Sequence, residues 1–151
     1  MQRKSSKSSK TNEEKITVPS SFECLRIVRD FVKKNIPKDK FDKSVVEQIV
    51  LSVDEACSNI IEHSYEMDDS KEFFLTMKCN DKKVQFVIED NGTGMNVSQA
   101  VKPDIKKYVK DRKEGGLGKH IIKTVMDNVR YKKRGNRNIL SLTKYYDKST
   151  V

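Results

Sequence analysis

Three separated stretches of the sequence carry residue types that could bind a ligand or take part in a reaction. In the first, Glu55 and Asn59 are four residues apart, a spacing that places both side chains on one face of a helix. A carboxylate beside a carboxamide suits a general base next to an oxygen ligand for magnesium. An ordinary solvated helix face shows the same pair, so the pair alone leaves both interpretations open.

The second stretch has the sequence Asp-Asn-Gly-Thr-Gly and begins at Asp90, directly after an apolar run that ends at Ile88. A carboxylate at the end of a strand can accept a hydrogen bond from an exocyclic amino group. Gly92 and Gly94 would let the backbone turn sharply and approach a planar ring. The alternative for the same residues is a glycine turn capped by an Asp.

The third stretch consists of Gly115, Gly116, Leu117 and Gly118, immediately before an apolar pattern with helical spacing. Free amide groups and the positive end of a helix dipole can bind phosphate oxygens at such a place, and glycines also permit a hinge. The stretch is not a Walker A loop, because no Gly-Lys-Ser or Gly-Lys-Thr follows it. It also lacks the βαβ setting of a dinucleotide fingerprint.

Two helices and a hairpin are predicted to position the first two stretches. One helix begins near Ser21 and ends near Asn35, and its expected apolar face contains Phe22, Leu25, Ile27, Val28, Phe31 and Val32. A longer helix covers about 40–65, with apolar residues Phe41, Val45, Ile49, Val53, Ala56 and Ile60 at steps of three and four. Period-two runs at Phe73, Leu75 and Met77 and at Val84, Phe86 and Ile88 predict an antiparallel hairpin.

The rest of the chain completes one domain. A helix is expected to begin near Gly116, and two strands are expected at 129–131 and 138–144 around a turn at Gly135. The predicted fold class is α+β, a two-layer sandwich of a mixed, largely antiparallel sheet with helices on one face. With 151 residues, the chain is long enough for one domain and too short for two.

Domain boundaries follow from composition. Residues 1–14 are basic and serine-rich and are expected to be a flexible tail, followed by a short strand at 16–18 and a domain over 15–147. The run from Asn91 to Gly118 is rich in Gly and Lys and poor in large apolar residues, and its middle part, about 95–115, is the expected lid. Because passive connections of this length are uncommon, we expect a lid with one helical turn near 105–109.

Composition narrows the class of protein. The 31 basic and 22 acidic residues give a net charge of +9, which fits a polyanionic ligand or partner as well as a solvated lysine-rich surface. We expect a cytoplasmic protein without a membrane span, because no apolar run approaches the roughly 20 residues that a span needs. Cys24, Cys57 and Cys79 show no metal or redox spacing and are expected to be reduced.

The order of the three stretches resembles the GHKL ATPase superfamily, which contains the histidine kinase-like ATPases, over roughly 16–144. Residues 55–59 would be its N box, 90–94 its first glycine box and 115–118 its second. Within the superfamily the sequence looks most like the small anti-sigma-factor serine/threonine-protein kinases, because the N box opens with Glu55.

This resemblance implies ATP and Mg²⁺ as cofactors. Asn59 would hold magnesium, and Glu55 would be the catalytic general base toward a serine or threonine hydroxyl. Asp90 would bind the adenine amino group. The remaining nucleotide contacts would come from Gly92, Gly94, Gly115, Gly116, Leu117 and Gly118.

The implied function is that of an anti-sigma factor that sequesters a sigma factor and phosphorylates an anti-anti-sigma partner, and a homodimer is compatible with it. Two positions depart from the family's pattern: Glu114 stands where relatives often have Arg, and no Thr follows Gly135. Arg112 or Lys113 could substitute for the missing Arg. A non-catalytic nucleotide-binding interaction module is therefore kept as the alternative.

Direct nucleic-acid binding ranks below both alternatives. The sequence has no helix-turn-helix or RNA-recognition signature. In addition, aromatic residues do not alternate with the basic cluster at 132–134.

Overall fold

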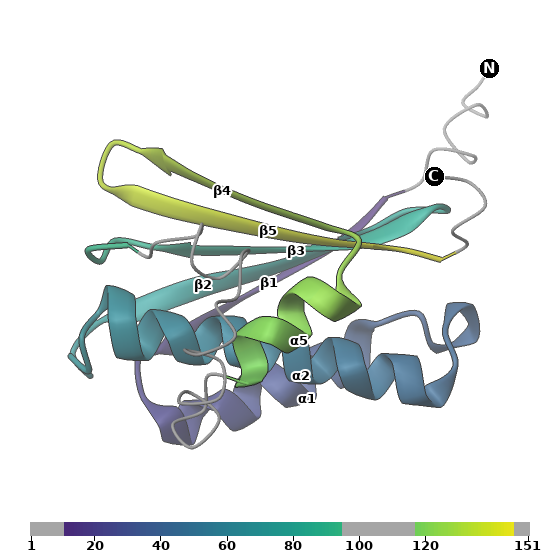
Figure 1. The fold of residues 1–151 in the computed structure, drawn as a ribbon, viewed down its shortest axis with the longest axis horizontal. Helices are drawn as coiled ribbons and strands as arrows, with labels where there is room; N and C mark the ends of the chain where they lie inside the picture. The colour runs from purple at the N-terminus through teal and green to yellow at the C-terminus, as the bar shows by residue number, and fades with distance from the viewer. Residues whose placement is uncertain (1–10, 95–116, 147–151) are drawn as a thin grey trace.

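The computed structural model describes residues 11–94 and 117–146, with side chains described except at 117–120. This part of the chain has two layers, a sheet and a group of helices on one of its faces (Figure 1). The predicted α+β sandwich is therefore confirmed. Every pairing between the described strands is antiparallel, so the sheet is more uniform than the mixed sheet that the prediction allowed.

The sheet has five strands in the order β1-β2-β3-β5-β4. Their bounds are β1 Asn12–Pro19, β2 Glu72–Cys79, β3 Lys83–Asp90, β4 Asn128–Arg134 and β5 Arg137–Tyr145. The predicted hairpin forms β2 and β3, and its register pairs Leu75 with Ile88 and Met77 with Phe86. Both apolar runs therefore point to the same face of the sheet, as their period of two requires.

The first strand is longer than predicted. It begins at Asn12, which pairs with Cys79, so residues 12–14 belong to the sheet and not to a flexible tail. Glu13 and Glu14 are exposed on this edge strand. Backbone hydrogen bonds to β2 can keep such polar residues in a strand. The sequence therefore shows no apolar pattern at this part of β1. Residues 1–10 of the predicted tail lie outside the described residues.

The helices are α1 Leu25–Asn35, α2 Lys43–Asn59 and α5 Leu117–Val125. A 3₁₀ turn at Phe22–Cys24 precedes α1, so the regular helix begins later than predicted. Phe22 and Ile27 were expected on the apolar face, but they are 45% and 44% exposed. Ile27 cannot share a face with Val28, because successive residues point about 100° apart around a helix.

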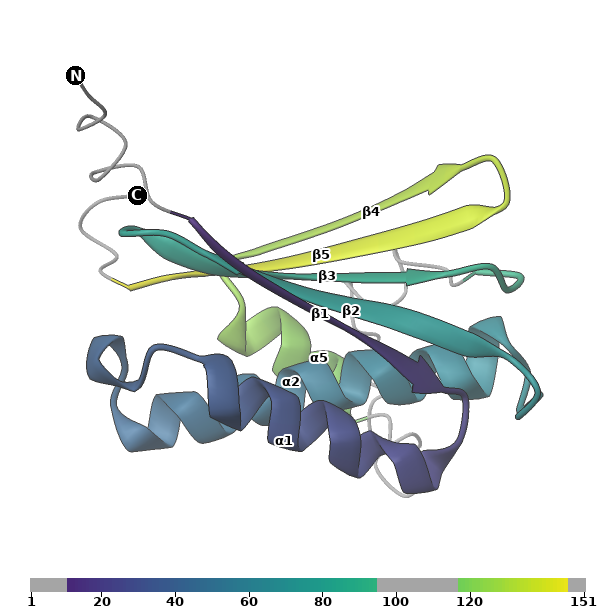
Figure 2. The same ribbon diagram turned by 180° about the vertical axis from the view of Figure 1, so that it is seen from behind.

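The core lies between α1, α2 and α5 and the inner face of the sheet. Of the apolar residues predicted for the long helix, Ile49, Val53, Ala56 and Ile60 are buried, and Phe41 and Val45 are partly buried. They pack near fully buried sheet residues such as Phe73, Phe86 and Leu142. Within residues 11–94 and 117–146, no helix covers the other face of the sheet (Figure 2).

An ion pair links α1 to α2. The Arg29 guanidinium donates to Asp54 Oδ1 at 2.9 Å. Burial raises the pKa of Asp54 above its ordinary value, and this effect exceeds the lowering by the hydrogen bond and the charge of Arg29. Nearby, burial raises the pKa of Cys57 well above its ordinary value, so this free thiol stays neutral in the core.

The packing of the two layers is tested by Phe86→Ala. Phe86 is 0% exposed, and truncating a buried Phe typically costs about 3–5 kcal/mol of unfolding free energy. Denaturant unfolding should show this loss. Val87→Ala is the control on the same strand, and it should cost less because that side chain is only partly buried. Equal losses for the two variants would contradict this assignment of the core.

The raised pKa of Asp54 predicts a pH dependence. Since the folded chain binds this proton more readily than the unfolded chain, the contribution of Asp54 to stability is fully present below about pH 4 and is lost as pH rises through the raised pKa. Asp54→Asn removes the titration, so the stability of the variant relative to wild type should increase between about pH 4 and pH 7.

Urea unfolding over that pH range would measure this difference. Asp30→Asn, on the exposed side of α1, is the control. Stability curves for wild type and Asp54→Asn that stay parallel over the whole range would contradict the prediction.

Candidate functional site

The helix that carries the first motif changes its geometry directly after that motif. Residues Ile60–Ser64 continue α2 as a π-helical turn, in which the Tyr65 amide donates to the Ile60 carbonyl at 2.8 Å. Short π-helical segments of this kind are frequent at functional sites. The wider turn brings Ser64 and Tyr65 to the end of β3.

Asn59 is the last residue of α2, and Glu55 lies one turn before it, as the spacing predicted. Asn59 is 4% exposed, and its carboxamide forms no hydrogen bond with another described residue. Its amide atoms are not fully enclosed, so this group is open to a ligand. An amide oxygen is the kind of hard donor that magnesium accepts. Glu55 is partly buried.

Asp90 ends β3 and points into the space between the two layers. It is 4% exposed, and its Oδ1 accepts three hydrogen bonds: from the Ser64 hydroxyl at 2.5 Å, the Gly92 amide at 2.8 Å and Asn138 Nδ2 at 2.8 Å. No described residue donates to its other oxygen, Oδ2. Asp90 is therefore a fixed, buried carboxylate with one oxygen left to accept a donor.

The two predicted glycines follow Asp90 in a turn that is held on Ser64. The Thr93 amide donates to the Ser64 carbonyl at 2.8 Å, and the Gly94 amide donates to the Ser64 hydroxyl at 3.0 Å. A Cβ at Gly92 would overlap the Ser64 carbonyl. Gly94 has a φ of 91°, a conformation that L side chains rarely adopt. Both positions therefore require glycine, as the motif predicted.

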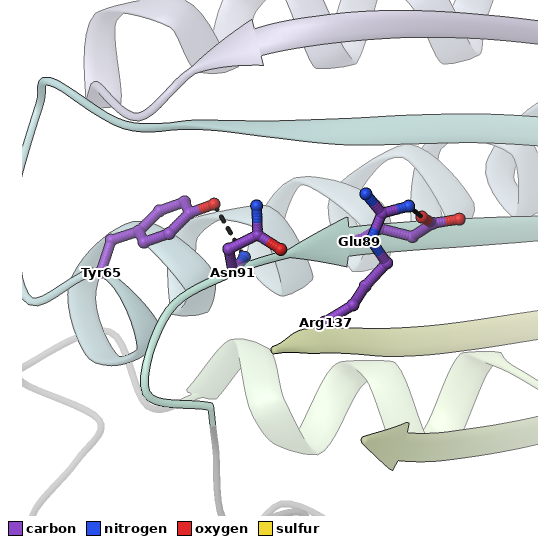
Figure 3. Close-up of polar contacts among 4 residues, drawn as sticks. All are labelled: Tyr65, Glu89, Asn91 and Arg137. Atoms are coloured by element: carbon purple, nitrogen blue, oxygen red, sulfur yellow. Dashed lines mark hydrogen bonds and ion pairs between the residues drawn. The ribbon is translucent and has the colours of Figure 1, made fainter. Parts of the chain in front are cut away.

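Tyr65 fixes the start of this turn from the other side (Figure 3). Its hydroxyl donates to the Glu72 carbonyl at 2.6 Å and accepts from the Asn91 amide at 3.0 Å. Burial raises the pKa of Tyr65, although the Asn91 amide lowers it, so the phenol stays neutral and keeps its proton to donate. On the neighbouring strands, Arg137 pairs with Glu89 at 2.7 Å.

Two residues of this network were missed by the sequence analysis. Asn138 is 1% exposed and stands opposite Asp90 in the register of β3 and β5. Its Nδ2 also donates to the Gly92 carbonyl at 3.0 Å, and its buried Oδ1 has no hydrogen-bond partner in the described part of the chain. The family's pattern has a Thr directly after the glycine of this hairpin, whereas here the contact to Asp90 comes from Asn138, three residues after Gly135. Ser64, the other missed residue, is separated from Asp90 by 26 positions.

The second glycine motif is only partly described. Leu117 and Gly118 form the start of α5, at the helix terminus where a phosphate site was predicted. Gly115 and Gly116 lie outside the described residues, as do the predicted lid and Glu114. Their predicted roles remain predictions.

A pocket beside the glycine turn is lined by Asn91, Gly92, Lys133, Gly135 and Asn136. The Lys133 ammonium donates to the Thr93 carbonyl at 3.2 Å on this side. A larger hollow lies on the open face of the sheet, lined by residues of β3, β4 and β5. Asp90 points to the inner face of the sheet, so this larger hollow on the open face is not the candidate site. The polar groups around Asp90 locate the site.

Among residues 11–94 and 117–146, no group of three or more His, Cys, Asp or Glu side chains could hold a metal ion. The Asn59 amide oxygen could hold a metal together with oxygens of a ligand. The same part of the chain contains no helix that is long and apolar enough to cross a membrane.

Comparisons with known proteins agree with this geometry. The family model of the histidine kinase-like ATPase domain matches residues 18–144. The serine-protein kinase RsbW of Halalkalibacterium halodurans is 29% identical over 140 residues, which cover 90% of this chain and 85% of that protein. The serine-protein kinase RsbW of Bacillus thuringiensis is 28% identical over 138 residues, which cover 89% and 85% of the two chains.

Two solved structures share the fold. A chain with the RsbU and RsbW domains of a Mycobacterium tuberculosis protein superposes with a TM-score of 0.60 at 16% identity, covering 88% of this chain and 32% of that one. A chain of the SiaB-SiaC complex from Pseudomonas aeruginosa superposes with a TM-score of 0.58 at 12% identity, covering 87% and 89%.

The tight contact at Gly92 is tested by Gly92→Ala. The added Cβ would overlap the Ser64 carbonyl, so the turn would have to move, and we expect a loss of about 1–3 kcal/mol in unfolding free energy. Gly135→Asn is the control, since Gly135 has a φ of 64° with open space around its Cβ position, and Asn tolerates this conformation. A Gly92→Ala variant as stable as wild type would contradict the close approach.

Proposed function

Because the chain belongs to the histidine kinase-like ATPase domain family, we propose that it is an ATP-dependent serine/threonine-protein kinase and an anti-sigma factor. It would sequester a sigma factor and phosphorylate an anti-anti-sigma protein. The observation that carries the nucleotide part is the buried Asp90 carboxylate, with three donors on Oδ1 and none from a described residue on Oδ2.

The base would bind at Asp90. An ionised carboxylate oxygen only accepts hydrogen bonds, and the exocyclic amino group of adenine is a donor. The absence of side chains at Gly92 and Gly94 would let the ring lie against the backbone of the turn. This arrangement favours adenine over a base with a carbonyl oxygen at the same ring position.

The phosphates would extend from the base toward the end of α2 and the start of α5. Bound Mg²⁺ would neutralise phosphate charge, and the Asn59 amide oxygen would be its protein ligand. The buried carboxamide of Asn59, without a partner among the described residues, fits this role. The backbone of Gly115, Gly116, Leu117 and Gly118 would hold the phosphate oxygens at the helix terminus.

Glu55 would act as the general base. Its carboxylate would take the proton of a serine or threonine hydroxyl on the partner protein as that oxygen forms a bond to the γ-phosphorus. The bond from the γ-phosphorus to the bridging oxygen breaks, and its electron pair stays on the ADP product. The position of Glu55 one helical turn from Asn59 supports this role, because the general base and the magnesium ligand then face the same bound nucleotide.

The partners are proposed from the relatives. The similar proteins of H. halodurans and B. thuringiensis are named serine-protein kinases RsbW. We assign this chain a sigma factor and an anti-anti-sigma phospho-acceptor as partners, a homodimer as a compatible assembly, and the cytoplasm as its place of action. Direct binding to nucleic acid is not part of the proposal.

The second candidate is a nucleotide-binding interaction module that transfers no phosphate. It is favoured by Glu114, an acidic residue at a position where the family often has an arginine. An arginine there could stabilise the charge that develops on the transferred phosphate, whereas a carboxylate would repel it.

Glu55→Gln separates the two candidates. With Mg²⁺, labelled ATP and a candidate anti-anti-sigma protein, the kinase predicts phosphate transfer by wild type and a loss of about 10²–10⁴-fold in the variant. Calorimetry should show that the variant still binds ATP. Glu62→Gln is the control, because Glu62 is exposed on the π turn. Full activity of Glu55→Gln would refute the general base, and ATP binding without transfer by wild type would support the module.

A further inference from the structure

Ser64 holds the glycine turn with both its side chain and its backbone. Its hydroxyl donates to Asp90 Oδ1 and accepts from the Gly94 amide, and its carbonyl accepts from the Thr93 amide and, at 3.1 Å, from the Thr93 hydroxyl. The residue itself is 1% exposed. A single residue of the π turn thus holds both ends of the segment 90–94.

The hydroxyl of Ser64 helps to saturate one oxygen of Asp90. A carboxylate oxygen has two lone-pair sites, and Oδ1 already accepts from Ser64, Gly92 and Asn138. It has no capacity left for a ligand. The donors come from the π turn, the glycine turn and β5, so they also fix the rotation of the carboxylate about its terminal torsion, which is otherwise broad.

We propose that Ser64 is a positioning residue that determines base specificity, by holding Oδ1 of Asp90 so that Oδ2 alone faces the base. This inference rests on the proposed nucleotide function. An oxygen that only accepts, held in one orientation, selects a purine with an amino group at position 6 and rejects a purine with a 6-oxo group. Oδ2 of Asp90 and a 6-oxo oxygen are both acceptors, so without a hydrogen between them they repel each other.

The side chain can be separated from the backbone contacts. In Ser64→Ala, the carbonyl of residue 64 can still accept from Thr93, so the turn keeps its backbone anchor. The variant loses the hydroxyl that Asp90 and Gly94 share. The carboxylate then gains rotational freedom, and its discrimination between the two purines should weaken more than the stability of the fold.

The test compares the binding of ATP and ITP, each with Mg²⁺, to the full chain by calorimetry. Wild type should prefer ATP. In Ser64→Ala the affinity for ATP should fall about 10-fold, the loss typical of one hydrogen bond to a charged group. The affinity for ITP should change less, so the ratio of the two affinities falls. A general loss of structure would weaken both nucleotides equally.

Ser52→Ala is the matched control. Ser52 is 0% exposed on the same helix, and its hydroxyl donates to the Gln48 carbonyl at 2.9 Å, with no contact to Asp90. It should leave the ratio unchanged. If Ser64→Ala does not fold, Asn138→Ala, which removes a different donor from Oδ1, should lower the ratio in its place.

The outcomes distinguish the two claims. Wild type that binds neither nucleotide overturns the proposed function itself. Wild type that prefers ATP, with an unchanged ratio in the folded variant, overturns the role of Ser64 and leaves the nucleotide site standing.

Discussion

A carboxylate removed from water has to be hydrogen-bonded, and the site is organised around the way in which Asp90 meets this requirement. Its donors are a hydroxyl from the π turn after α2, a backbone amide from the glycine turn and a carboxamide from β5. These groups come from three parts of the chain that only the complete fold brings together. The state of this one side chain therefore depends on the helix layer, the sheet register and the turn at once.

The other unusual features follow from this arrangement. The π turn places Ser64 against the turn after β3, and the close approach of its carbonyl leaves no room for a side chain at residue 92. Asn138 can reach Asp90 because antiparallel pairing puts the two residues opposite each other on the inner face. Asn59, the candidate magnesium ligand, directly precedes the π turn, and Ser64, which holds the Asp90 carboxylate, ends it. One continuous segment therefore fixes both the group suited to a metal and the group suited to a nucleobase.

Local sequence patterns predicted much of the fold and of the candidate site. Contacts between residues far apart in the sequence could not be predicted from such patterns. The hairpin and the buried face of α2 follow from apolar periods, and Asp90, Gly92 and Gly94 follow from their position after an apolar strand. Ser64 and Asn138 could not be found in this way, because a π turn and the pairing of β3 with β5 leave no local signal. The misplacement of Phe22 and Ile27 has a similar cause: an apolar residue type does not state which face of a helix it occupies.

The most direct test is a crystal structure of the full chain with Mg²⁺ and a non-hydrolysable ATP analogue. The exocyclic amino nitrogen should lie at about 3 Å from Asp90 Oδ2, and the Asn59 amide oxygen should lie at about 2.1 Å from the metal. A base bound elsewhere, with Oδ2 of Asp90 facing no ligand, would contradict this prediction.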